Sequence, residues 1–126
     1  MKVQHIDHVA ITVSDLGRSL AWYRDVLGLE RRHEEAWGDV PTMMCAGETC
    51  VALFPSDVAD LKEVNVRETA SMRHFAFRVD RANFEAAQAR FREQGIEFLS
   101  ADHGIAQSVY IVDPDGHRIE ITTYDV

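Results

Sequence analysis

Three residues of this 126-residue chain have side chains and neighbours that suit metal chemistry: His8, His74 and Glu120. Glu120 alternates with Ile119 and Ile121, and alternate residues of a strand point to opposite faces. The carboxylate is therefore directed away from the two isoleucines, and burying it is costly unless it is paired or binds a metal. Two neutral imidazoles and one carboxylate suit a divalent transition metal with open coordination positions.

Each of these residues also has an ordinary structural interpretation. A single histidine in a strand is more often a packed or rim residue than a ligand, and a single strand glutamate is usually solvated. Only the combination of the three residues favours a metal site. The prediction therefore depends on whether the strands that carry them bring the three side chains together.

The elements form an internal repeat. Alternation of apolar and polar residues over 5–13 predicts a strand, and helical spacing predicts an amphipathic helix from Asp15 to about residue 27, ended by Gly28. Three short segments follow, and the same order restarts at residue 73. The predicted strands after the first helix are 29–37, 42–45 and 49–54; the second set is strand 73–79, helix 80–94 and strands 96–100, 108–112 and 118–124.

The two halves align residue by residue. An offset of 66 places His8 on His74, and an offset of 68 in the last strands places Ala52 on Glu120. Such self-similarity indicates a duplicated module. It also puts the two histidines at equivalent positions of equivalent strands.

Length and composition predict one domain with a substantial core. We expect an α+β fold of two βαβββ modules, at about residues 4–55 and 73–125, joined by a connector at 56–72.

A net charge of -8 and a pI near 5.1 disfavour nucleic acid and anionic membranes as partners. No apolar run reaches the roughly 18 residues of a membrane span, and no signal-peptide core follows Met1, so we expect a cytoplasmic protein. Cys45 and Cys50 flank a predicted hairpin connection and are expected to be reduced structural thiols.

The chain resembles the vicinal oxygen chelate superfamily, also called the glyoxalase, bleomycin resistance and dioxygenase superfamily. The segments that carry the resemblance are HIDHVAITV, SDLGRSLAWYRDVLGLE, RHFAFRVD and VYIVDPDGHRIEI. It implies paired modules whose mixed sheet curls around a metal site, with the helices outside. The family's ligand positions fall on His8, His74 and Glu120, and the implied cofactor is a divalent metal ion, Fe(II) before Mn, Zn or Ni.

The closing segment resembles the extradiol dioxygenase signature. The matching residues are His103, Val109, Tyr110, Asp113, Pro114, Gly116 and Glu120, whereas Ala101 departs at the first position. The resemblance implies catalytic roles for His103 and Tyr110, as hydrogen-bonding partners of a bound catecholate and oxygen. The plainer interpretation, a loop histidine and a strand aromatic, stays open.

In the last strand of the first module, this chain departs from two kinds of enzyme in the superfamily that it resembles. Extradiol enzymes have an acid-base histidine where this chain has Cys50, Ala52 and Phe54, and glyoxalase I has a fourth carboxylate ligand at the position of Ala52. The three-ligand pattern also resembles fosfomycin-modifying thiol transferases. Lys62 and Arg67 are too few to form a phosphonate site.

Large side chains near the strand ends predict an apolar pocket, although core or dimer packing explains them equally well. These residues are Trp37, Met43, Phe54 and Tyr124. Arg78 and Arg118 share faces with His74 and Glu120, and either pairs a substrate carboxylate or bridges acidic neighbours.

These observations predict a small metal-dependent enzyme, dioxygenase-like, whose substrate chelates the metal through adjacent oxygens. A glyoxalase-like lyase or a thiol transferase is the alternative. A different class, the drug-binding resistance proteins, lacks the three ligands that this chain retains. Exposed sheet edges predict a homodimer.

Overall fold

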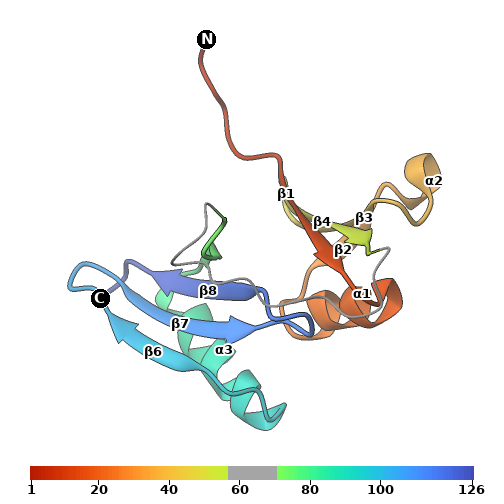
Figure 1. The fold of residues 1–126 in the computed structure, drawn as a ribbon. Coiled ribbons are helices and arrows are strands. Elements are labelled where there is room, and N and C mark those ends of the chain that lie inside the picture. Colours follow the sequence, from red (N-terminus) through yellow and green to blue (C-terminus); the bar gives the residue numbers. More distant parts are fainter. Residues whose placement is uncertain (57–70) are drawn as a thin grey trace. The chain divides into compact units, whose positions relative to one another are not determined.

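The computed structural model describes residues 1–56 and 71–126 (Figure 1). The chain divides into two compact units, Met1–Lys62 and Glu63–Val126, and the division falls within the predicted connector. Residues 57–70 of that connector, including Lys62 and Arg67, lie outside the described part.

The first unit is a four-stranded mixed sheet with two helices. Its strand order is β1-β4-β3-β2, with β1 and β4 parallel and the other pairs antiparallel. Helix α1 packs against β3 and β4. The elements are β1 (His8–Val13), α1 (Leu16–Asp25), β2 (Glu30–Arg32), α2 (Glu34–Trp37), β3 (Thr42–Ala46) and β4 (Thr49–Pro55).

The second unit repeats this arrangement. Its strand order is β5-β8-β7-β6, again with the first and last strands parallel, and α3 packs against β8. The predicted α+β fold of two βαβββ modules is confirmed, and within the described residues the strands form two separate four-stranded sheets. The elements are β5 (Phe75–Arg78), α3 (Arg81–Glu93), β6 (Leu99–Asp102), β7 (Gln107–Val112) and β8 (Arg118–Thr123).

The register of the parallel pairs confirms the sequence alignment of the two halves. Ala10 lies opposite Ala52 in the first sheet, and Ala76 lies opposite Glu120 in the second. These positions differ by 66 in the first strands (76 − 10) and by 68 in the last strands (120 − 52). Ala52 and Glu120 therefore occupy the same place in the two sheets.

One face of each sheet is buried under a helix. In β1 the buried residues are Ile11 and Val13, whereas His8, Ala10 and Thr12 are exposed. The alternation predicted from the sequence thus separates a helix-facing side from the side that carries the histidines. In the second unit, Figure 1 shows α3 lying along one side of the sheet, where its buried residues are Phe84 and Phe91.

The predicted strand at 29–37 is wrong in its second half. Strand β2 ends at Arg32, His33 has a left-handed φ of 63°, and the short helix α2 follows. Arg31 explains the reversal, because its guanidinium lies 3.1 Å from Glu34 and 2.9 Å from Asp39. These ion pairs hold the residues that follow β2 against Arg31, so the strand does not continue.

The prediction of reduced cysteines is also wrong, since Cys45 and Cys50 form a disulfide. The two residues are direct register partners in the β3–β4 hairpin, and their Cα atoms are 4.1 Å apart. The strands continue through Ala46 and Thr49, so the turn is shorter than the sequence indicated and brings the two sulfur atoms together.

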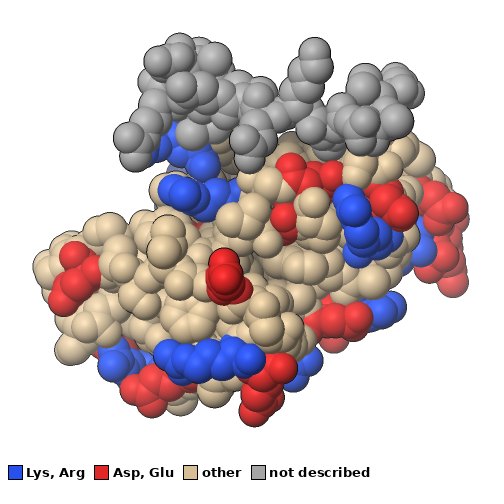
Figure 2. Space-filling view, turned by 60° about the horizontal axis from the view of Figure 1, so that its bottom comes forward, with Lys and Arg blue, Asp and Glu red and all other residues tan. Residues whose placement is uncertain are grey.

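Figure 2 shows acidic and basic side chains interspersed on the face that it draws. Among the described residues, no helix combines the length and apolar character that crossing a membrane requires.

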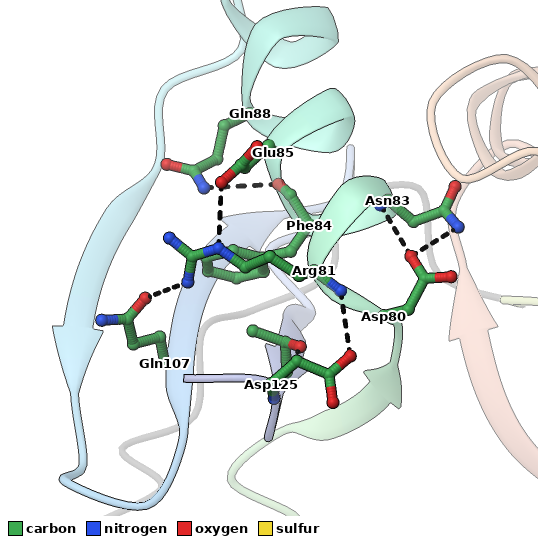
Figure 3. Close-up of polar contacts among 9 residues, drawn as sticks. Asp80, Arg81, Asn83, Phe84, Glu85, Gln88, Gln107 and Asp125 are labelled. Carbon is green, nitrogen blue, oxygen red and sulfur yellow. Dashed lines mark hydrogen bonds and ion pairs between the residues drawn. The ribbon is translucent and has the colours of Figure 1, made fainter.

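An aspartate begins each long helix. The Asp15 carboxylate accepts from the backbone N–H of Arg18 at 2.9 Å, and the Asp80 carboxylate accepts from that of Asn83 at 2.8 Å. Figure 3 shows the start of α3, where the backbone N–H of Arg81 also donates to Asp125 near the C-terminus. Residues from two distant parts of the chain thus meet at this helix end.

We expect Asp15→Ala and Asp80→Ala each to lower the free energy of unfolding by about 1 kcal/mol, because each leaves a helix N–H without its acceptor. Urea denaturation followed by circular dichroism measures the change. Glu97→Ala is the control, since this exposed carboxylate caps no helix, and its effect should stay below about 0.5 kcal/mol. Equal effects in all three variants would contradict the capping role.

Candidate metal centre

His74 and Glu120 meet on the open face of the second sheet. Nε2 of His74 lies 2.9 Å from Oε2 of Glu120. The parallel pairing brings them together, because His74 immediately precedes Phe75 and Glu120 immediately follows Ile119, which are register partners. Two of the three predicted metal ligands are therefore neighbours within one unit.

Glu120 is a nearly buried carboxylate that interacts with His74, Ser108 and Tyr110. Only 11% of its side chain is exposed, against 35% for His74. The hydroxyl of Ser108 on β7 donates to Oε1 of Glu120 at 2.5 Å, and the hydroxyl oxygen of Thr122 lies 3.0 Å from that of Ser108. A buried carboxylate needs such partners to offset its lost hydration.

The spacing of the two donor atoms fits a shared ion. Two ligand atoms about 2.1 Å from an octahedral ion and about 90° apart lie roughly 3.0 Å from each other. The separation between His74 Nε2 and Glu120 Oε2 is 2.9 Å. The imidazole and the carboxylate thus present their donor atoms at the distance of adjacent ligands.

The sequence-predicted pair of His103 and Tyr110 also comes together. Nε2 of His103 lies 3.1 Å from the Tyr110 hydroxyl, and the Tyr110 ring meets His74 edge to face with centroids 5.6 Å apart. Tyr110 is the register partner of Glu120 across β7 and β8. The phenol therefore lies between His103 and the His74–Glu120 pair.

Burial, followed by the negative charge of Glu120, raises the pKa of the Tyr110 hydroxyl above its ordinary value of 10.0. The phenol consequently stays protonated at neutral pH. It can donate a hydrogen bond to an acceptor on this face of the sheet.

His8 belongs to the first unit. Its Nδ1 lies 2.7 Å from a carboxylate oxygen of Asp7, a contact that leaves Nε2 as the free ring nitrogen. Over residues 1–56 and 71–126, no three His, Cys, Asp or Glu side chains are grouped closely enough to hold an ion. The complete set of His8, His74 and Glu120 therefore stays a prediction.

A cavity of about 360 Å³ lies beside His8 in the first unit. Three of the four predicted pocket residues line it, whereas Tyr124 belongs to the second unit and stacks on Arg78. Most of the wall is apolar, and the polar contribution comes from Asp7 and His8. The lining residues are Asp7, His8, Trp37, Val40, Pro41, Met43, Ala52 and Phe54.

Ala52 stands where the second unit has Glu120, and it is buried with Met43 and the Cys45–Cys50 disulfide. This part of the first unit therefore offers neither the histidine of extradiol enzymes nor the carboxylate of glyoxalase I.

Arg78 and Arg118 do not bridge acidic neighbours within the described part of the chain. The Arg118 guanidinium lies over the Tyr110 ring at 5.9 Å, and that of Arg78 lies over Tyr124 at 4.7 Å. Both arginines stack on aromatic rings instead.

Sequence reasoning missed Ser108 and Asp7. Ser108 lies two residues before Tyr110, so strand alternation already placed it on the same face. Asp7 precedes His8 directly, and a carboxylate beside a predicted histidine ligand is a recurring arrangement. Both signals were present in the sequence.

The model of the Glyoxalase/Bleomycin resistance protein/Dioxygenase superfamily matches residues 5–121. Metallothiol transferase FosB of Staphylococcus epidermidis is 28% identical over 98% of this chain and 84% of its own length. Catechol-2,3-dioxygenase of Bacillus subtilis is 30% identical over 93% of this chain, but the match spans 40% of the dioxygenase.

Solved structures show the same fold. A glyoxalase/dioxygenase from Nostoc punctiforme superposes with a TM-score of 0.81, covering 95% of this chain and 90% of that chain at 23% identity. The fold of this chain is thus shared with known structures.

Removing the Ser108 hydroxyl is expected to destabilise the metal-free protein. Ser108→Ala leaves Oε1 of buried Glu120 without its donor, which costs about 1–3 kcal/mol. Ser100→Ala, an exposed serine on β6, is the matched control and should change stability by less than about 0.5 kcal/mol. Urea denaturation in the presence of a chelator compares the two, and equal stabilities would show that the hydrogen bond carries no weight.

Proposed function

This chain belongs to the Glyoxalase/Bleomycin resistance protein/Dioxygenase superfamily, and from that premise we propose that it is a metal-dependent enzyme. His8, His74 and Glu120 would hold a divalent ion, with Fe(II) favoured. The ion would supply Lewis acidity and a template for a substrate that chelates through two adjacent oxygens. The 2.9 Å separation of the His74 and Glu120 donor atoms supports this ligand set.

We propose dioxygenase-like chemistry, and the contact between His103 and Tyr110 beside His74 carries this proposal. Tyr110 would donate a hydrogen bond to a substrate oxygen as negative charge develops on it. His103, 3.1 Å from the phenol, would accept or return the proton. Both residues match positions of the extradiol signature.

The proton transfers would fall to His103 because the positions that correspond to the acid-base histidine of extradiol enzymes hold no titratable group. Cys50 is in a disulfide, and Ala52 and Phe54 carry no titratable group. This differs from the extradiol arrangement, in which a separate histidine serves as acid and base. In the proposed reaction His103 therefore both contacts the Tyr110 hydroxyl and serves as acid and base.

The cavity beside His8 supports a substrate with an apolar body. Trp37, Met43 and Phe54 contribute large apolar surfaces, and a volume of about 360 Å³ suits a single aromatic ring with substituents. We further propose a homodimer, because each described sheet has two edge strands, β1 and β2 in the first unit and β5 and β6 in the second.

Metal-dependent thiol transfer is the second candidate. The similarity to metallothiol transferase FosB extends over 84% of that enzyme, whereas the similarity to catechol-2,3-dioxygenase covers 40% of it. The two candidates differ in their co-substrate, oxygen or a thiol, and this difference separates them experimentally.

Protein purified without chelator is expected to contain about one metal ion per chain by atomic emission spectrometry. His74→Ala and Glu120→Ala should lose the ion, because each removes one of three protein ligands. His5→Ala, which removes an exposed histidine outside the proposed set, should retain it. Equal metal content in the wild type and both ligand variants would sink the proposed site.

Protein loaded anaerobically with Fe(II) is expected to consume oxygen when mixed with a vicinal diol from a broad panel. Tyr110→Phe should lower the rate on the order of 100-fold by removing the phenol donor, whereas Tyr124→Phe should leave it unchanged. An oxygen electrode records the rates. Anaerobic adduct formation with a thiol, without oxygen uptake, would replace the dioxygenase proposal with thiol transfer.

A further inference from the structure

We propose that Arg118 selects substrates that carry a carboxylate group beside the chelating oxygens. This inference rests on the proposed function, because it concerns the substrate of the same site. It derives from the position of Arg118 on the sheet, from its lack of an acidic partner among the described residues and from the geometry of its side chain.

Arg118 lies on the face that carries the candidate metal centre. It is two residues from Glu120 on β8, so both side chains point to the same side of the sheet. It also precedes Ile119, the register partner of Phe75, and therefore lies level with His74 on the neighbouring strand. An anionic group bound by Arg118 would thus be adjacent to the His74–Glu120 pair.

The charge of Arg118 is not paired with a carboxylate within the described part of the protein. The chain has 21 acidic residues against 13 lysines and arginines, and Arg24, Arg31 and Arg81 each bind a carboxylate. Arg118 binds none of the described carboxylates. Glu120, two residues away, is instead occupied by His74 and Ser108.

Tyr110 orients the Arg118 guanidinium without occupying its hydrogen-bond donors. The central carbon of the guanidinium lies 5.9 Å from the centre of the phenol ring, a distance typical of a cation–π contact. The Arg118 side chain is exposed. Its N–H groups therefore remain available to a ligand that lies on this face.

A planar guanidinium matches a carboxylate through two parallel hydrogen bonds. The favoured substrate is therefore a diol, or a similar chelator, with a carboxylate on a neighbouring carbon. A tetrahedral phosphonate offers the same charge with different geometry, so it serves as a comparison. A neutral diol would lack this contact altogether.

The test measures binding to protein loaded with Zn²⁺, an ion without redox chemistry. Isothermal titration calorimetry compares 2,3-dihydroxybenzoate with catechol and with 2,3-dihydroxyphenylphosphonate. The carboxylate probe is expected to bind about 10- to 100-fold more tightly than catechol, the range for a charge-assisted hydrogen-bonded pair. Arg118→Gln should abolish that preference, and Arg118→Lys should retain only part of it.

Arg92→Gln is the matched control, because Arg92 also stacks on an aromatic ring, that of Phe98 at 5.2 Å, but belongs to α3. It should preserve the preference for the carboxylate. Equal binding of the two probes, no binding of either, a stronger preference for the phosphonate, or a preference that survives Arg118→Gln would overturn the inference. Failure of the wild type to take up Zn²⁺ would instead contradict the proposed function, and metal content is measured on each sample beforehand.

Discussion

The parallel pairing of the first and last strands is the constraint on which each unit depends. β1 pairs with β4 in the first unit (order β1-β4-β3-β2), and β5 pairs with β8 in the second (order β5-β8-β7-β6). Parallel neighbours need a crossover connection, and here a helix in that connection covers one face of the sheet. That face becomes the core, so the polar residues of the same strands are confined to the other face. His74 and Glu120 meet because this pairing sets them side by side.

Much of this arrangement could be predicted because it depends on patterns of period two and on the repeat. Alternation in β8 already separated Glu120 from Ile119 and Ile121, and the offsets of 66 and 68 agree with the observed register. The contact between His103 and Tyr110 followed from a resemblance rather than from spacing. Its proximity to His74 became evident only once β7 and β8 were paired.

The remaining features depend on contacts that strand patterns do not encode. Helix α2 arises where Arg31 pairs with Glu34 and Asp39, and local alternation says nothing of such ion pairs. The Cys45–Cys50 disulfide depends on a hairpin turn that is tighter than expected. Alternation placed the Ser108 side chain on one face of its strand, but only the pairing of β7 with β8 shows that it meets the Glu120 carboxylate.

Equivalent places in the two sheets hold Glu120 and Ala52, and this asymmetry has a consequence for the cavity. A duplicated module supplies each strand position twice, and at this position the second copy has a buried carboxylate whereas the first has alanine. The first copy therefore needs no hydrogen-bond partners for a buried charge at this position, and Ala52 forms part of the cavity wall instead. Replacing Ala52 by another uncharged residue would therefore change the wall of this cavity without leaving a buried carboxylate unpaired.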